Sequence, residues 1–279
     1  MSPRGVELKK PAEMRVMRRA GLVVAEALAA MGAAVRPGVS TGELDQIGRE
    51  VLAANGATSS FLNYGAEWGY PPYPGVACIS VDEEIVHGIP GERVLAEGDI
   101  VSIDFGAIID GWHGDAARSF FVGDVTDQVR KLAADTEASM WAGIAAARVG
   151  GRIGDISAAI EASITASDPR YGIIREYTGH GIGSQMHMDP DVPNHGRRGR
   201  GPKVVEGMCL AIEPMLTLGS ADTATLEDEW TVVTRDRSWA AHWENTIAIT
   251  KAGVWVMTEH DGGEARLTEL GVPFAPLAD

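Results

Sequence analysis

The residues of this sequence that could carry out chemistry are four acids and one histidine, which stand in apolar or glycine-rich runs typical of strands. Carboxylates buried without a partner are costly, so a bound cation is their natural counterpart. An imidazole flanked by glycines suits a borderline divalent metal. Four negative charges and one neutral nitrogen would balance two divalent cations, which together lower the pKa of bound water and polarise a carbonyl in hydrolysis. These residues are Asp104, Asp115, His180, Glu213 and Glu244.

Asp104 and Asp115 lie in two strand-like runs around Asp110-Gly111, a dipeptide typical of a two-residue hairpin turn. With that turn, the numbers of directly opposed residues sum to 221, as 110 and 111 do. Asp104 is then opposite Ala117, and Asp115 lies two residues further along the same face. Diagonal neighbours of this kind are about 7 to 8 Å apart at the backbone, so the two carboxylates can converge.

The elements that position these residues are predicted from hydrophobic period and chain breakers. Apolar residues at helical spacing predict a helix over Pro11–Ala34. Ser40 with Glu43 three residues later is a capping-box pattern that starts a second helix, which ends at Gly56. The remaining texture predicts strands and hairpins over 76–122, a helix over 127–148, and strands and loops from 171 to the end.

Two weak internal repeats indicate a duplicated architecture. Residues 36–47 resemble residues 148–159 at an offset of 112, and residues 97–104 resemble residues 206–213 at an offset of 109. Each copy of the second repeat ends in a carboxylate. Nearly equal offsets favour two related α/β halves whose carboxylates face each other across a pseudo-two-fold axis.

Composition limits the class of protein. The 279 residues include 24 basic and 39 acidic side chains, and a net charge of -15 disfavours extensive binding of DNA or of anionic membranes. Cys78 and Cys209 are too few for a disulfide framework. With no signal-peptide pattern and no long apolar run, we expect a cytoplasmic protein. The basic segment NHGRRGRGPK, which contains Arg197, Arg198 and Arg200, is either a solvated loop or a transient contact with the ribosome.

Five motifs resemble the methionine aminopeptidases, which share the pita-bread fold with prolidase and aminopeptidase P. In chain order they are CISVDEEIVHGIP, IDFGAIIDGWHGD, GHGIG, AIEPM and WTVVTRDRSWAAHWENTIAIT. The resemblance implies an α/β (α+β) pita-bread fold of two pseudo-symmetric halves, with antiparallel sheets flanked by helices. It implies one catalytic domain over 1–279 with a short N-terminal extension, 1–10, and neither a zinc-finger nor a creatinase-type N-terminal domain. The 31 positions from Glu213 to Glu244 leave no room for the type II helical insertion, so type I is expected.

The resemblance also assigns the metal ligands. Asp104 would bind one divalent ion, His180 and Glu213 the other, and Asp115 and Glu244 both. Cobalt, manganese, iron or zinc would each suit this ligand set.

Three residues receive catalytic roles from the same resemblance. His87 would contact the substrate backbone, and His187 would donate a hydrogen bond to the carbonyl oxygen as charge develops there. Glu213 would shuttle a proton from the attacking water to the leaving amine.

The methionine side chain would lie against sulfur and aromatic groups, which suit a thioether. The residues implied are Tyr70, Tyr73, Cys78, Met186 and Trp230. Asn245 and Met186 depart from the residues common in the family and affect pocket shape. His113 is expected to act as scaffold, whereas the other unassigned histidines are expected to be surface or structural residues: His195, His242 and His260.

The implied function is metal-dependent removal of the initiator methionine from nascent proteins and peptides with a small second residue, by a monomer. A proline-specific peptidase of the same fold is the first alternative. A non-catalytic binding protein of this fold is a remote one, because all five ligand types are present together with His87 and His187.

Overall fold

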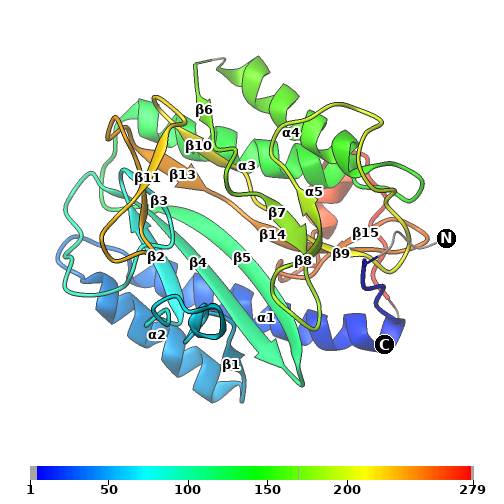
Figure 1. Cartoon of the computed structure of the whole chain (residues 1–279), viewed down its shortest axis with the longest axis horizontal. Coiled ribbons are helices and arrows are strands. Elements are labelled where there is room, and N and C mark those ends of the chain that lie inside the picture. Colours follow the sequence, from blue (N-terminus) through cyan, green and yellow to red (C-terminus); the bar gives the residue numbers. More distant parts are fainter. Residues whose placement is uncertain (1–4, 169, 278–279) are drawn as a thin grey trace.

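The first half of the chain pairs two helices with a twisted antiparallel sheet in this computed structural model, which describes residues 5–168 and 170–277. Helices α1 and α2 pack against the sheet β1-β4-β2, to which β5 is added through β4 (Figure 1). The bounds are α1 Pro11–Ala34, α2 Thr41–Ala54, β1 Thr58–Ser59, β2 Ala77–Val81, β4 Ile100–Ile109 and β5 Trp112–Phe121. Residues 1–4 of the expected N-terminal extension lie outside the described residues.

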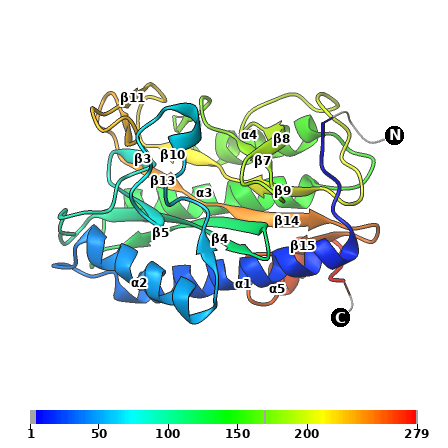
Figure 2. The ribbon, with the colours of Figure 1, turned by 60° about the horizontal axis from the view of Figure 1, so that its bottom comes forward.

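The second half repeats this plan with two helices and the sheet β15-β14-β9-β7-β8. Its elements are α3 Asp127–Ala146, α4 Ile153–Ser167, β7 Gly179–Gly181, β8 Met188–Val192, β9 Cys209–Ile212, β14 Asn245–Ile249 and β15 Val254–Val256. In Figure 2 the strands β4, β5 and β14 run side by side above α1. Each half has its own large apolar core cluster between its helices and its sheet.

Two small sheets and two short helices complete the fold. One sheet has the order β13-β10-β6 and the other β11-β12-β3. The bounds are β3 Glu84–Val86, β6 Gly172–Ile173, β10 Met215–Thr217, β11 Thr223–Thr225, β12 Val232–Thr234, β13 Ala240–His242, the 3-10 helix η1 Ala66–Trp68, and α5 Glu264–Glu269. Among the helices of the described chain, none combines the length and apolar character that a bilayer crossing needs.

The local sequence signals predicted the first helices well. Helix α1 has the predicted bounds, and α2 begins after Ser40, whose hydroxyl accepts from the Glu43 amide in the predicted capping box. The expectation of strands and loops alone after residue 171 is wrong, because α5 forms over Glu264–Glu269. Asp261 accepts hydrogen bonds from the amides of Gly263, which precedes this helix, and of Ala265 in its first turn. The helix is too short to leave a helical period in the sequence.

The predicted hairpin register is confirmed. Strands β4 and β5 pair over ten residues, with Asp104 opposite Ala117 and Gly106 opposite Asp115. Asp110 and Gly111 both have positive φ, as a tight hairpin turn requires. The two carboxylates therefore project from one face of the sheet.

Backbone hydrogen bonding repeats between the two halves at the offsets seen in the sequence. Isolated bridges join Ser40 to Val94 in the first half and Arg152 to Lys203 in the second. Arg152 lies 112 positions after Ser40, and Lys203 lies 109 positions after Val94. The Arg152 amide before α4 donates to Asp155 Oδ2, as the Ser40 amide before α2 donates to Glu43 Oε2. Two further backbone hydrogen bonds repeat in the same way. Gly38 N donates to Leu95 O as Gly150 N does to Val204 O, and Thr41 N donates to Arg93 O as Ile153 N does to Pro202 O. The duplication predicted from the sequence is thus present in the fold.

The two halves meet along a seam between β5 and the start of β14. The Glu244 amide donates to Ala117 O at 2.9 Å, and the Ala117 amide returns a longer bond of 3.4 Å to Glu244 O. The Thr246 hydroxyl accepts from the Asp115 amide at 3.1 Å and donates to the Asp115 carbonyl at 2.7 Å. The seam therefore fixes the backbones of Asp115 and Glu244 relative to each other.

Replacing Thr246 with valine should destabilise the protein, because it leaves buried backbone groups of Asp115 without this hydroxyl partner. We expect the free energy of unfolding in urea, measured in EDTA, to fall by about 1 to 3 kcal/mol. Thr165→Val is the matched control, since the exposed Thr165 hydroxyl bonds only within its own helix turn to Glu161 O, and its effect should stay within about 0.5 kcal/mol. Equal losses in both variants would contradict a special contribution of the seam.

Candidate active site

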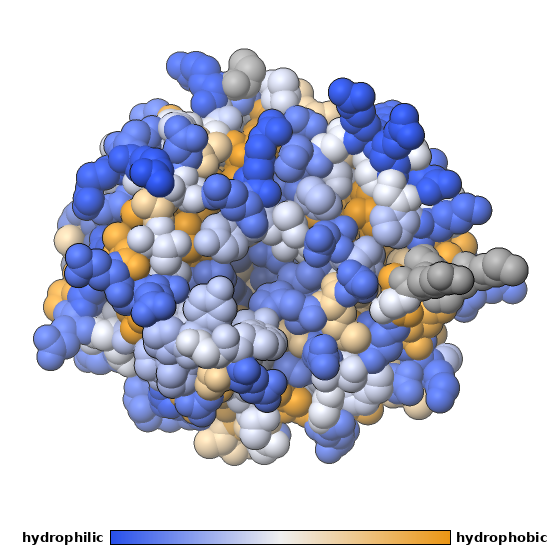
Figure 3. Space-filling view, viewed as in Figure 1, coloured by the Kyte–Doolittle hydropathy of each residue, from blue (hydrophilic) through white to orange (hydrophobic). Residues whose placement is uncertain are grey.

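A cavity of about 490 Å³ lies where the two halves meet, and it is lined by all five predicted ligands. The face in Figure 3 is hollowed near its centre and framed by hydrophilic side chains. Two of these ligands come from β4 and β5 of the first half, and three come from β7 and the segments next to β9 and β14 in the second. The structure thus brings together Asp104, Asp115, His180, Glu213 and Glu244.

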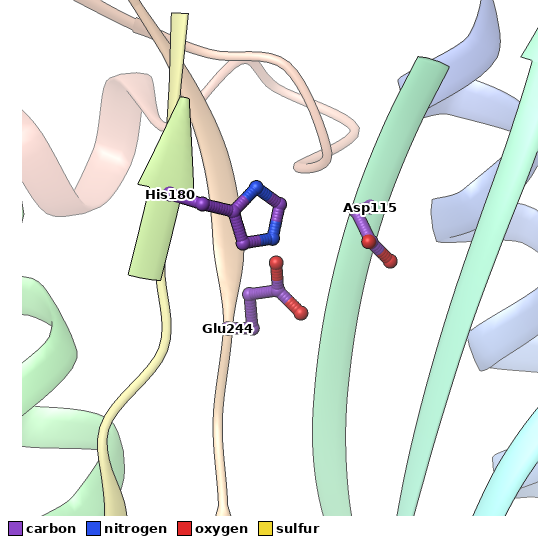
Figure 4. A group of neighbouring side chains, drawn as sticks. All are labelled: Asp115, His180 and Glu244. Carbon is purple, nitrogen blue, oxygen red and sulfur yellow. The ribbon is translucent and has the colours of Figure 1, made fainter. Parts of the chain in front are cut away.

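The ligating atoms of these side chains point into one shared space. Oxygen or nitrogen atoms of Asp115, His180 and Glu244 all lie within 4.8 Å of one another (Figure 4). His180 Nε2 lies 3.4 Å from Glu213 Oε1, and the charge of Asp115 acts directly on the Asp104 carboxyl. Asp115, His180 and Glu244 expose only 3, 5 and 2 % of their surface, so water cannot neutralise this charge.

Burial and mutual repulsion make the carboxylates weak acids when no cation is bound. Burial raises the pKa of Asp115 to about 7. Burial, followed by the charges of neighbouring carboxylates, raises the pKa of Asp104 and Glu244 well above the usual range. The pKa of Glu213 rises for the same reasons, burial first and Asp115 second. Such a cluster favours cations, because a bound ion replaces the protons that the acids would otherwise keep.

The donor set fits divalent metal ions. Among the described residues, Asp104 Oδ1, Asp115 Oδ1 and Glu244 Oε1 are buried without a hydrogen-bond partner. His180 Nδ1 lies 2.9 Å from the Gly181 carbonyl oxygen, which can only accept. The ring proton is therefore on Nδ1, and Nε2 is left with a free lone pair towards the carboxylates. Lone pairs that lack donors are what a metal requires from its ligands.

Arg118 supports Glu244 from behind. Its guanidinium donates to the carbonyl oxygens of Ala117 and Glu244, to Asn245 Oδ1 at 2.8 Å and to Glu259 Oε1 at 2.7 Å. This cation counteracts part of the rise in the Glu244 pKa. Asn245, a departure from the family pattern, thus belongs to the network that holds Glu244.

His87 and His187 line the same cavity. Burial lowers the pKa of both rings to about 4, and in His87 the neighbouring His187 adds to the effect. Both imidazoles are therefore neutral near pH 7 and can donate one hydrogen bond each. The ring of His187 meets that of His180 edge to face, with centroids 4.4 Å apart.

One wall of the cavity is apolar and rich in sulfur and aromatic rings. Its core consists of Phe61, Tyr73, Cys78 and Met186, with Tyr64, Ile89 and Trp230 packed against it. Four of the five predicted pocket residues, Tyr73, Cys78, Met186 and Trp230, therefore line the cavity.

Tyr70 does not line the cavity, and Tyr64 does. Tyr70 is 57 % exposed and reaches only the outer side of Trp230, with ring centroids 6.3 Å apart. Gly65 and Gly69 take positive φ on either side of η1, and this turn of the loop separates Tyr70 from Tyr64. Several tyrosines follow one another in this segment, and their spacing alone does not distinguish them.

His242, expected to be a surface or structural residue, lines the cavity and is 2 % exposed. Its Nε2 lies 3.7 Å from Glu213 Oε2. The internal repeat of the sequence contained a signal for this placement of His242. Asn245 pairs with Ile212, so the same register continued by one residue sets Glu244 opposite Glu213. His242 is then diagonal to Glu213, as Asp115 is to Asp104.

His113 does not line the cavity, and its Nδ1 lies 2.9 Å from the Ser60 hydroxyl, which agrees with the predicted scaffold role.

Known proteins are similar to this chain in both architecture and sequence. The model of metallopeptidase family M24 matches residues 15–251. Methionine aminopeptidase 1 of Mycobacterium tuberculosis is 50% identical over 260 residues, which cover 91% of this chain and 96% of that protein. The crystal structure of methionine aminopeptidase from Rickettsia prowazekii has a TM-score of 0.86 and 37% identity, covering 91% of this chain and 100% of that one.

A more distant likeness concerns the fold alone. Prolidase from Pyrococcus furiosus has a TM-score of 0.71 at 19% identity, and the match covers 90% of this chain but 65% of that one. The pita-bread fold expected from the sequence motifs is therefore the fold of this protein. Because the family model and relatives of high identity span nearly the whole chain, the protein belongs to metallopeptidase family M24.

Proposed function

We propose that this metallopeptidase removes the N-terminal methionine from nascent proteins and peptides and prefers a small second residue. The observation that carries the proposal is the junction of two surfaces in one cavity. A cluster of buried carboxylates with unpartnered oxygens adjoins a wall of sulfur and aromatic side chains. The first surface suits metal-assisted hydrolysis, and the second suits a thioether side chain.

The proposed ligand assignment follows the sequence motifs. Asp104 would hold one divalent ion, His180 and Glu213 the other, and Asp115 and Glu244 both. When bound, the two ions supply Lewis-acid polarisation of the scissile carbonyl and a water that ionises near neutral pH. Cobalt, manganese, iron and zinc all suit oxygen ligands with one imidazole.

The chain's own groups would bind the peptide and move its protons. His87 contacts the substrate backbone beside Trp230, whose ring centroid is 6.2 Å from its own. Glu213 accepts a proton from the attacking water and delivers it to the leaving amine. Neutral His187 donates a hydrogen bond to the carbonyl oxygen as negative charge develops there.

The expected setting of the reaction is the cytoplasm, with the N-termini of nascent chains as substrates and a monomer as the active species. The arginines of the basic loop, Arg197, Arg198 and Arg200, are exposed. Contact of this loop with the ribosome stays a prediction from the sequence.

Metal removal followed by a choice between two peptides tests the function directly. Chelation should abolish hydrolysis of Met-Ala-Ser, and Co²⁺, Mn²⁺, Fe²⁺ or Zn²⁺ added singly should restore it, because the unpartnered carboxylates require a cation. Ala-Pro-Ser should remain uncleaved under every condition, as followed by chromatography of the released amino acid. Cleavage of Ala-Pro-Ser alone would transfer the assignment to a proline-specific peptidase.

Metal affinity should fall as the pH falls through about 7. A carboxylate must lose its proton before it binds a cation, and burial raises the pKa of Asp115 to about 7. His180, whose pKa is lowered to about 3, stays neutral and adds nothing to the change. We expect the Mn²⁺ dissociation constant from calorimetry to rise at least about fivefold between roughly pH 7.5 and 6. A constant affinity across this range would contradict the assignment of Asp115 as a ligand.

His187→Ala should lower kcat for Met-Ala-Ser by about 100-fold or more, since it removes a hydrogen-bond donor to the developing oxyanion. KM should change much less, because the apolar wall remains intact. His260→Ala is the control, as the exposed His260 lies outside the cavity. If both variants kept the activity of the parent protein, the proposed role of His187 would be refuted.

A further inference from the structure

Tyr64 and His187 form a hydrogen-bonded pair across the boundary between the two halves. The Tyr64 hydroxyl lies 2.5 Å from Nδ1 of His187, and the rings meet edge to face with centroids 5.3 Å apart. Tyr64 belongs to the loop between β1 and β2, whereas His187 belongs to the loop between β7 and β8. Neither the sequence motifs nor the mechanism described above gives Tyr64 a role.

Packing determines where the Tyr64 ring can lie. It has edge-to-face contact with Trp68 at 5.1 Å and a tilted contact with Trp230 at 6.4 Å, and it packs on the apolar wall around Phe61. Although the Tyr64 ring is only partly buried, these contacts hold its hydroxyl at a defined place. The hydroxyl can therefore act on Nδ1 of His187 before any substrate arrives.

The direction of this hydrogen bond decides which nitrogen of His187 carries the proton. A phenol hydroxyl is the more acidic partner and a neutral imidazole nitrogen the better acceptor, so the favoured bond runs from Tyr64 to Nδ1. Burial and the charge of Asp115 raise the pKa of Tyr64, which keeps the hydroxyl protonated. The ring proton of His187 is then on Nε2.

We propose that Tyr64 is a positioning residue that holds His187 in the tautomer protonated at Nε2, the form able to donate a hydrogen bond to the substrate carbonyl. This inference rests on the proposed function, in which His187 is that donor. His180 is held in the opposite tautomer by the Gly181 carbonyl. Two neighbouring rings thus present different groups to the cavity, a lone pair from His180 and an N–H from His187.

Nitrogen-15 NMR of the histidine side chains in metal-free protein tests the proposal without any turnover. In the parent protein we expect His187 to give the shifts of a protonated Nε2 and an unprotonated Nδ1. In Tyr64→Phe both nitrogens should move towards averaged values, because the ring is free to exchange tautomers. Tyr73→Phe is the matched control, since the Tyr73 hydroxyl bonds to the carbonyls of Ala77 and Gly88 and not to a histidine. It should leave the His187 shifts unchanged.

Steady-state kinetics give the second readout. Tyr64→Phe keeps the ring on the apolar wall, so kcat for Met-Ala-Ser should fall about three- to tenfold with little change in KM. Tyr171→Phe removes a hydroxyl of the same kind that bonds to Asp135, away from the cavity, and should leave both constants unchanged.

The results separate this inference from the proposed function. A parent protein whose His187 carries its proton on Nδ1 would overturn the inference, even if Met-Ala-Ser were cleaved normally. Unchanged His187 shifts in Tyr64→Phe would overturn it as well. Failure to cleave Met-Ala-Ser would instead refute the function, while the tautomer measured in metal-free protein would still stand.

Discussion

Repulsion among buried like charges is the constraint on which this structure depends. Four carboxylates share a cavity with few compensating donors; burial raises the pKa of each, and neighbouring carboxylates raise those of Asp104, Glu213 and Glu244 further. Either protons or cations must neutralise them, and cations bind them better near neutral pH. The polar groups around the cluster are arranged accordingly. The Gly181 carbonyl oxygen holds the ring proton of His180 on Nδ1, so that Nε2 faces the carboxylates without a proton. Arg118 places its positive charge behind Glu244.

A duplicated backbone supplies the geometry that brings the acids together. The same hydrogen bond from the residue before a helix to an acid three residues later, and the same bridge to a returning segment, occur in each half. The seam at Ala117 and Glu244 then joins the halves where the acids are densest. Thr246 completes the junction by bonding both backbone groups of Asp115. Each half therefore contributes part of the candidate ligand set, and the seam sets the distance between the two parts.

Sequence signals predicted elements of the first half that depend on local periodicity or turn type, and the repeat between the halves, but no helix was predicted where α4 forms over Ile153–Ser167. The bounds of α1, the cap of α2 and the register of β4 against β5 follow from residues close together in the chain. The five candidate ligands could be singled out because acids within apolar strands, and a histidine between glycines, are unusual. Tyr64 and Tyr70 could not be distinguished, since the loop that carries them is directed by packing against Trp230 from the other half. The place of His242 beside Glu213 could be predicted only by applying the strand register of the first half to the second half.

The transferred register also makes the two ends of the cluster chemically unequal. Asp115 stands diagonal to Asp104 in the first half, whereas an imidazole, His242, takes the corresponding place beside Glu213. With His180 also on that side, one end offers hard oxygen donors alone and the other mixes oxygen with softer nitrogen. A near-symmetric scaffold thus presents two environments of different hardness.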